Sequence, residues 1–243
     1  MKQQRKVHRV FINSIFNTDI FTCSHELSHR IKNVLRIKEN DELIIFNNKK
    51  EQYLCSVKYE NKIIILILKN KITLKISCKK NISLAVSIVS MKVMDLIIQK
   101  SVELNVNCFH PIYTNRSQYK DIQKKISHWE KIIIHATEQS GRCELMKMYA
   151  PLALNEYISS NNAGLRYILH QNGKPFTQDE LSKDNFSFFI GPEGGFDDKE
   201  LDIFEINEWK MKKISENILR TETACISIAT LINNYESFSR NSL

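Results

Sequence analysis

Glycine and proline are scarce in this chain, which has six glycines and four prolines among its 243 residues. Even so, three of the glycines and one proline fall within residues 191–195, directly after the apolar run 186–190. Glycine permits left-handed backbone and close approach, so this cluster predicts a tight loop at the end of a buried strand. It is not a nucleotide-binding loop of the common kinds. No Gly-Lys-Ser/Thr follows, and the Gly-x-Gly-x-x-Gly spacing is absent.

Long apolar runs are also missing. The densest run, residues 63–68, has a lysine on either side and is too short to span a bilayer. The basic start leads into a mixed strand and not into a signal-peptide core. The sequence therefore predicts a cytoplasmic protein without a membrane segment.

Cysteine and histidine motifs are absent as well. The six cysteines are scattered, and the closest pair in sequence is Cys55 and Cys78, so there is no Cys-x-x-Cys. We expect buried, reduced thiols. His25 and His29 share a helical face, but no zinc motif that includes a glutamate surrounds them. The sequence predicts no metal.

Acidic residues are scarce only near the N-terminus. Residues 1–80 hold 17 Lys and Arg against 7 Asp and Glu, whereas the remaining residues hold 18 against 20. The AT-rich codon usage suggested by abundant Lys, Asn and Ile would explain part of this excess, but not its confinement to one end. The asymmetry predicts that the first part of the chain binds a polyanion.

The N-terminal part has the pattern of a small β-barrel or curled sheet. Short strands are expected at 7–13, 19–23, 42–47, 52–59 and 63–68, with a helix that Ser24 caps and that runs to about residue 36. The lysine-rich stretch 69–80 is the expected linker.

From Ile82 the pattern becomes one of strands alternating with helices, which predicts a parallel sheet covered on both faces. The expected strands are 82–89, 108–113, 165–169 and 186–190, and the expected helices are 91–104, 120–139, 198–206 and 221–235. Open parallel sheets bind ligands beyond the carboxyl ends of their strands. Three loops fall there: 169–171, 191–195 and 214–220.

Two segments near the C-terminus, 189–196 (FIGPEGGF) and 218–224 (ILRTETA), resemble those of the bacterial 16S ribosomal RNA (uracil-N3)-methyltransferases. This is the ribosomal RNA small subunit methyltransferase E family of the SPOUT superfamily. Further matches follow in the family's order at 8–12, at 99–106 with Asn105 in place of a glycine, at Arg116-Ser117 and at 138–142.

The resemblance implies an α/β protein of two domains: a PUA-like RNA-binding β-barrel at 1–72 and a SPOUT methyltransferase domain at 73–243 with a C-terminal trefoil knot. It also implies a homodimer that binds S-adenosylmethionine and acts on 16S rRNA, within the assembled small subunit. The cofactor-binding residues that it implies are Leu169, His170, Ile190, Gly191, Glu193, Gly194, Gly195, Ile214, Ser215, Ile218, Leu219, Arg220 and Thr223.

The chain departs from the family at Ser215 and Glu216, where the family has Gly-Pro. A serine would cost about 1–2 kcal/mol at a left-handed glycine position and little elsewhere. Loss of the proline would leave the loop less rigid. We therefore expect a working but looser cofactor site.

The implied reaction is attack by uracil N3 on the cofactor's methyl group, which depends on alignment and on stabilisation of charge. Arg220 is the first candidate for stabilising the anion. Glu222 is a candidate proton acceptor, although a glutamate at a helix start is often only a partner of the helix dipole. Arg9, Arg36, Arg116 and Arg142 are candidates for RNA contact, with salt bridging or helix termination as the alternative for Arg116 and Arg142.

Two other functions stay open. One is a different SPOUT methyltransferase that modifies transfer RNA or a ribose 2′-hydroxyl, against which the segment 220–224 and the N-terminal barrel argue. The other is a degenerate knotted domain that binds ribosomal RNA without catalysis. Binding of S-adenosylmethionine would distinguish an enzyme from such a binding module.

Overall fold

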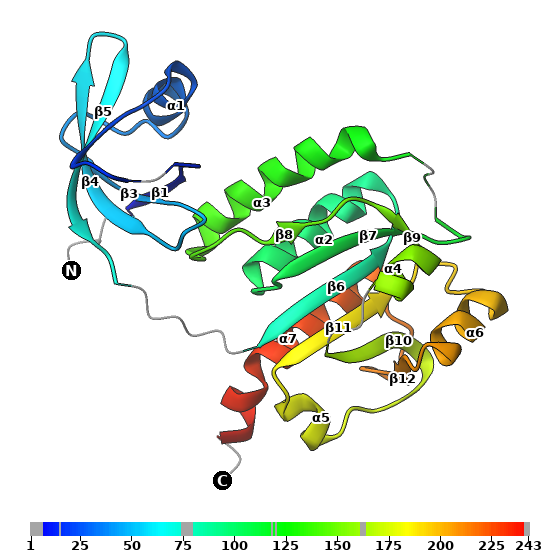
Figure 1. The fold of residues 1–243 in the computed structure, drawn as a ribbon. Helices are drawn as coiled ribbons and strands as arrows, with labels where there is room; N and C mark the ends of the chain where they lie inside the picture. The colour runs from blue at the N-terminus through cyan, green and yellow to red at the C-terminus, as the bar shows by residue number, and fades with distance from the viewer. Residues whose placement is uncertain are drawn as a thin grey trace. The chain divides into compact units, whose positions relative to one another are not determined.

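The computed structural model describes residues 7–14, 16–73, 80–117, 119, 121–160 and 164–240. For residues 238–240 it describes the backbone only. The chain forms two compact units (Figure 1). Unit 1 combines Met1–Ile76 with Thr137–Leu145, and unit 2 combines Ser77–Ala136 with Met146–Leu243. Half of the expected linker, residues 74–79, lies outside the described ranges.

Unit 1 is a five-stranded mixed sheet with one short helical segment. The strands, in spatial order, are β1 (His8–Phe11), β3 (Glu42–Phe46), β4 (Gln52–Glu60), β5 (Ile63–Lys71) and β2 (Ile20–Thr22). The β1–β3 pair is parallel and the other pairs are antiparallel. Alternation along β3, β4 and β5 buries Leu43, Ile45, Cys55, Val57, Ile64 and Leu66 in one core.

The helical segment of unit 1 begins as expected and ends earlier. The side chain of Ser24 accepts the Leu27 N–H and so caps α1 (His25–His29). From Arg30 the hydrogen bonding changes, and the segment continues as the π-helix η1 (Arg30–Val34). The sequence predicted a single helix to about residue 36, and this prediction is wrong from Arg30 onward.

Unit 2 contains the predicted parallel sheet. In spatial order its strands are β12 (Lys210–Lys212), β10 (Leu165–Lys174), β11 (Asn185–Ile190), β6 (Asn81–Ser87), β7 (Cys108–Tyr113) and β8 (Lys147–Met148), with β9 (Leu152–Ala153) also paired to β7. Every one of these pairings is parallel. The expectation of a parallel sheet is confirmed.

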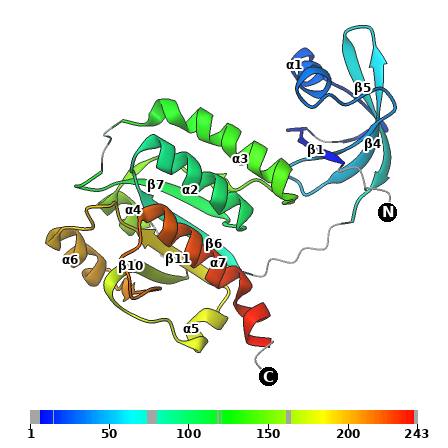
Figure 2. The ribbon, with the colours of Figure 1, turned by 180° about the vertical axis from the view of Figure 1, so that it is seen from behind.

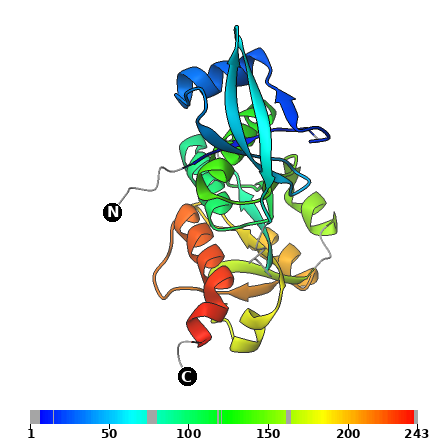
Figure 3. The same ribbon diagram turned by 90° about the vertical axis from the view of Figure 1, so that its left-hand side faces the viewer.

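Helices cover both faces of this sheet. Figure 2 shows α2 (Met91–Glu103) and α7 (Thr221–Arg240) together over one face. The opposite face carries α4 (Leu154–Ser160) and α6 (Asp198–Ile206), as the side view in Figure 3 shows. On that face Ala85, Ile168 and Phe189 of the strands pack with Tyr157 of α4 and Phe204 of α6. Another helix, α3 (Ile126–Ser140), begins in this unit after the 3-10 turn η2 (Gln123–Lys125).

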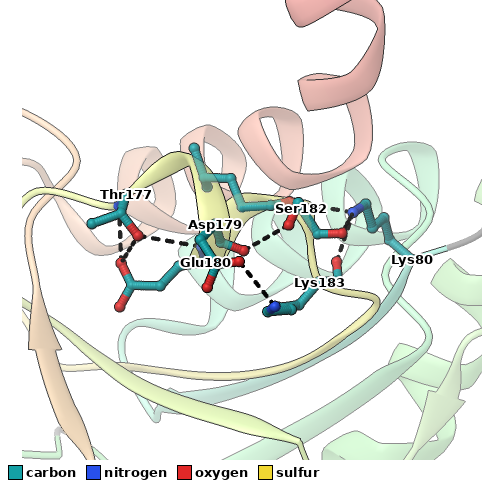
Figure 4. Close-up of polar contacts among 7 residues, drawn as sticks. Lys80, Thr177, Asp179, Glu180, Ser182 and Lys183 are labelled. Carbon is teal, nitrogen blue, oxygen red and sulfur yellow. Dashed lines mark hydrogen bonds and ion pairs between the residues drawn. The ribbon is translucent and has the colours of Figure 1, made fainter.

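The short helix α5 (Gln178–Ser182) is held at both ends (Figure 4). At its start, Thr177 and Glu180 form a reciprocal capping box. At its end, the Lys80 Nζ donates to the carbonyl oxygens of Leu181, Ser182 and Lys183 at 3.2, 2.9 and 2.6 Å. Lys80, the residue before β6, thus connects the start of that strand to the end of α5.

Two further expectations concern the whole chain. In the described ranges, no helix is long and apolar enough to cross a membrane. The cysteines that the structure describes form no disulfide. Cys23, Cys55 and Cys225 are buried, and Cys108 and Cys143 are partly exposed.

Candidate cofactor site

The candidate site lies at the edge of the sheet where β11 and β12 end on either side of β10. Leu169 of β10 is in register with Ile190 of β11 on one side and with Lys212 of β12 on the other. The loops 191–195 and 213–220 therefore leave the same edge of the sheet on the two sides of β10, as expected for parallel strands. A pocket of about 400 Å³ opens between them.

The three glycines of the first loop occupy positions that disfavour a side chain. Gly195 is left-handed (φ +69°), and its N–H closes the turn on the Pro192 carbonyl at 2.8 Å. At Gly191 a Cβ would lie 3.0 Å from the ring of Phe196. At Gly194 a Cβ would lie 3.2 Å from the Cδ of Arg116. Larger side chains would therefore distort or fill the wall of the pocket.

The start of α7 is attached to this loop. The Thr221 hydroxyl donates to the Gly191 carbonyl at 2.9 Å. The Arg220 carbonyl accepts the Ala224 N–H at 2.9 Å, which is the first intrahelical bond of α7. The Thr221 hydroxyl thus fastens the helix to the glycine loop.

The second loop is stabilised by its own polar side chains. The Ser215 Oγ accepts the Asn217 N–H at 3.0 Å. The Lys213 Nζ donates to both carboxylate oxygens of Glu216 at 2.9 and 2.8 Å. Ser215 is not among the residues with positive φ, so serine in place of glycine causes no left-handed strain here.

Arg116 is brought to the pocket by a turn after β7. The Glu200 Oε1 accepts the Asn115 N–H at 2.8 Å, and the Asp197 Oδ2 accepts from the Asn115 side chain at 2.7 Å. The hydrogen bond from the Asn115 side chain and that from the Glu200 N–H lower the pKa of Asp197. With the turn anchored in this way, the Arg116 guanidinium donates to the Gly194 carbonyl.

Most of the predicted cofactor-binding residues come together. All of them except Arg220 and Thr223 line the pocket, and so does Arg116, which the sequence had suggested for RNA contact. Arg220 and Thr223 are exposed, Glu222 is partly buried, and none of the three is part of the lining.

Some lining residues were not predicted individually, because the sequence indicated their loops and not their orientation. They are Gln171, Pro192, Phe196, Lys212, Lys213, Asn217, Thr221 and Ala224. The expected loop at residues 169–171 is wrong. β10 does not end at Leu169 but continues to Lys174, with an irregular register against β12. His170 and Gln171 thus line the pocket from within this strand.

The other candidate arginines lie in unit 1. The Arg9 guanidinium donates to the Gln52 Oε1 at 3.1 Å and to the Arg142 carbonyl at 2.9 Å, and it lies 4.8 Å from the centroid of the Phe46 ring. Burial lowers the pKa of Arg9. Its guanidinium is therefore used inside the unit, whereas Arg36 is exposed and left-handed (φ 55°).

The pocket has the size and lining of a small-molecule site. The glycine loop and apolar side chains such as Leu169, Ile190 and Leu219 line it, together with the basic residues Arg116, Lys212 and Lys213 and the acidic Glu193. Its volume is in the usual range for small-molecule sites. Among the described residues, no three His, Cys, Asp or Glu side chains are grouped so that they could hold a metal ion.

Residues 77–233 match the family model of the RNA methyltransferase domain, and residues 26–70 match that of the RNA methyltransferase PUA domain. The fold and the pocket are therefore those of an RNA methyltransferase with an N-terminal PUA-like domain.

Relatives that match nearly the whole chain narrow the class of RNA methyltransferase to which it belongs. A ribosomal RNA small subunit methyltransferase E of Mesomycoplasma hyopneumoniae is 31% identical over 229 residues, 92% of this chain and 98% of the relative. One from Aquifex aeolicus is 32% identical over 208 residues, 83% of this chain and 89% of the relative. The chain belongs to the ribosomal RNA small subunit methyltransferase E family.

Solved structures share the fold. A methyltransferase structure from Legionella pneumophila with bound cofactor S-adenosylmethionine superposes with a TM-score of 0.88 at 26% identity, covering 95% of this chain and 98% of the other. A ribosomal RNA small subunit methyltransferase E from Neisseria gonorrhoeae has a TM-score of 0.87 at 24% identity, covering 94% and 98%.

Proposed function

We propose that this chain transfers a methyl group from S-adenosylmethionine to N3 of a specific uridine in 16S ribosomal RNA. The pocket at the carboxyl edge of the sheet carries the proposal, because the glycine loop and the 213–220 loop together line it. The names of the relatives support the small-subunit RNA substrate. The solved relative with bound S-adenosylmethionine supports the cofactor.

The cofactor, when bound, supplies the methyl group, and the residues of the chain align the reaction. Leu169, Ile190 and Leu219 would bury its apolar parts, while the glycine loop offers N–H and carbonyl groups to its polar parts. Neutral main-chain groups are suited to a ligand that carries both signs of charge.

The target base must lose its N3 proton as the new bond forms. Arg116, which lines the pocket, is a candidate for contact with the RNA substrate, and Arg220 at the start of α7 is the candidate for stabilising the developing anion. Glu222 in the first turn of α7 is the candidate proton acceptor. Arg36 and Arg142 stay candidates for RNA contact.

We assign RNA binding to a PUA-like domain at 1–72 and catalysis to a SPOUT domain at 73–243 with a C-terminal trefoil knot. Membership of the family supports the knot. β10 also passes close to β12, because a Cβ on Gly173 would lie 2.3 Å from the backbone of Lys212.

We further propose that the enzyme is a cytoplasmic homodimer that acts on the assembled small subunit. Ile218 lines the pocket, yet 81% of its surface is exposed. A partner protomer that covered this isoleucine would also close the site to water, which favours methyl transfer over side reactions.

The test is transfer of labelled methyl from S-adenosylmethionine to small subunits from a strain that lacks this gene. Reverse transcription then maps the product, because a methyl group at N3 blocks the Watson–Crick edge. We expect one new stop near the 3′ end of 16S RNA. No incorporation by the folded protein would overturn the proposal, and a product without a stop would point to another atom, such as a ribose oxygen.

A further inference from the structure

A second pocket lies within unit 1, between the α1–η1 segment and the turn that joins β4 to β5. Its volume is about 390 Å³. Four basic side chains line it, and the lining contains no carboxylate. They are His25, His29, Lys32 and Lys62.

The local structure explains why these four side chains converge. His25, His29 and Lys32 follow one another at intervals of four and three residues, so they project from one side of the α1–η1 segment. Lys62 lies in the turn between β4 and β5, next to the left-handed Asn61 (φ 55°).

The two walls of the pocket are fixed to each other. The Oγ of Ser28 accepts the Ile64 N–H at 3.0 Å, which holds α1 against β5. The Tyr59 hydroxyl donates to the Ile37 carbonyl, and its ring lies 5.2 Å from the Lys32 Nζ. Burial, with Asp41 and Glu39 nearby, raises the pKa of Tyr59, so the phenol stays neutral. Neither of these acids lines the pocket.

The basic side chains of this pocket differ from others in unit 1 in lacking acidic partners. Arg30 pairs with Glu138, Lys50 with Glu144 at 2.9 Å and Lys69 with Glu42 at 2.9 Å. Within the part of the chain that the structure describes, none of the four basic residues of the pocket pairs with a carboxylate. All four are solvent-exposed, so they are available to an external anion.

We propose that this basic pocket binds a phosphodiester of the RNA substrate, and this inference rests on the proposed function. Ammonium, imidazole and amide N–H groups around an open, polar pocket match phosphate oxygens, which accept hydrogen bonds and carry the charge of RNA. The pocket would fix the position of the RNA without reading its bases. It adds residues of α1–η1 and the β4–β5 turn to the arginines suggested by sequence.

The test uses the full chain with the substitutions Lys32→Glu and Lys62→Glu together, and a fluorescein-labelled single-stranded RNA of 20 nucleotides. Its control is Lys58→Glu. Lys58 precedes Tyr59 in β4, so strand alternation directs its side chain to the other face of the sheet. Calorimetric binding of the demethylated cofactor product reports separately on unit 2.

We expect the double variant to bind RNA at least ~10-fold more weakly at 0.1 M salt, with a salt slope smaller by about 1.4, because two phosphate contacts are lost. Lys58→Glu is expected to change affinity less than ~3-fold. If the double variant is poorly folded, Lys32→Gln with Lys62→Gln replaces it, and the same ordering of affinities is expected.

Equal losses per reversed charge in the pocket and control variants would overturn this site, because the charge would then act without regard to position. That result would leave the proposed function intact as long as the wild type binds RNA and transfers methyl groups. A wild type that binds neither RNA nor the cofactor product would instead count against the proposed function itself.

Discussion

At the residue scale, the two departures at glycine positions of the family pattern have different structural consequences. Asn105 is left-handed (φ 58°) at the position of a family glycine, whereas Ser215 has no positive φ. Asparagine tolerates the left-handed region better than other residues with a Cβ. Because the departure at Ser215 is unstrained and the Lys213–Glu216 pair supports the same loop, neither change argues for a degenerate site.

This difference gives a test by substitution. Asn105→Ala should lower the free energy of unfolding by about 1–2 kcal/mol, because alanine is strained at positive φ. Asn105→Gly should cause no loss, since glycine adopts this conformation freely. Urea denaturation measures both. Equal stability of the alanine and glycine variants would show that the left-handed conformation is not costly here.

A second prediction at this scale concerns pH. His110 stacks on Tyr149 with ring centroids 4.1 Å apart, and its Nδ1 is buried without a partner. Burial and, secondarily, Lys147 lower the pKa of His110 from 6.5 to about 4. Below pH 6.5 the unfolded chain therefore binds a proton at His110 that the folded chain does not bind until about pH 4. As the pH is lowered from 6.5 to 4, the free energy of unfolding should fall by about 1.4 kcal/mol per pH unit.

His110→Phe keeps the stacked ring but does not titrate, so it should flatten the pH dependence of unfolding in this window. Urea denaturation at pH 7.5, 6 and 5 makes the comparison. A variant whose stability falls with pH as steeply as that of the wild type would exclude His110 as the responsible group.

At the element scale, Lys80 gives a prediction about α5. Lys80 is 5% exposed, and its ammonium group is the hydrogen-bond donor for three consecutive carbonyls (Figure 4). Lys80→Met keeps the length of the side chain and removes these bonds, so it should cost about 1–3 kcal/mol of unfolding free energy.

Lys183→Met is the matched control in the same region. It removes only the exposed ion pair with Asp179, which is expected to contribute less than about 0.5 kcal/mol. Thermal unfolding compares the two. If both variants unfold like the wild type, the contacts of Lys80 contribute nothing measurable to the stability of α5.

The clarity of the apolar pattern in an element decided whether the sequence could predict it. The helices α2 and α7 and the apolar strands β6 and β11 have a clear pattern, and all were expected near their observed positions. The elements β8, β9, α4, α5 and β12 were missed, because each is short and has no apolar run that marks it as a strand or a helix. β10 was expected to end early because its last residues, 170–174, are polar.

The site shows the same limit. The glycine cluster identified its loop, because a local pattern was enough. The placement of Arg116 in the pocket wall depends instead on Asn115 bonding to Asp197 and Glu200, which are more than 80 residues away in the chain. A contact of this kind leaves no local signal in a single sequence.

At the scale of the whole molecule, the composition of unit 1 could not be inferred from sequence. Residues Thr137–Leu145 belong to it, although 137–140 are the last residues of α3, a helix that begins in unit 2. Glu138 accounts for much of this attachment. Its carboxylate accepts the Phe11 N–H at 2.9 Å and two N–H groups of Arg30, and its side chain is 9% exposed. A domain boundary drawn from the composition of the sequence therefore leaves residues Thr137–Leu145 out of the first unit.

This leads to a prediction about fragments. Residues 1–76 alone should unfold with little cooperativity, because Arg30 and the Phe11 N–H lose their acceptor. Joining residues 137–145 to that fragment through a flexible Gly/Ser linker should restore cooperative thermal unfolding. Within the linked fragment, Glu138→Gln should cost about 1.5–3 kcal/mol, the usual contribution of a hydrogen bond to a charged group. Glu144→Gln, which removes only the exposed pair with Lys50, should cost less than about 0.5 kcal/mol. Cooperative unfolding of the unlinked fragment at the temperature of the linked one would mean that unit 1 does not need the inserted segment.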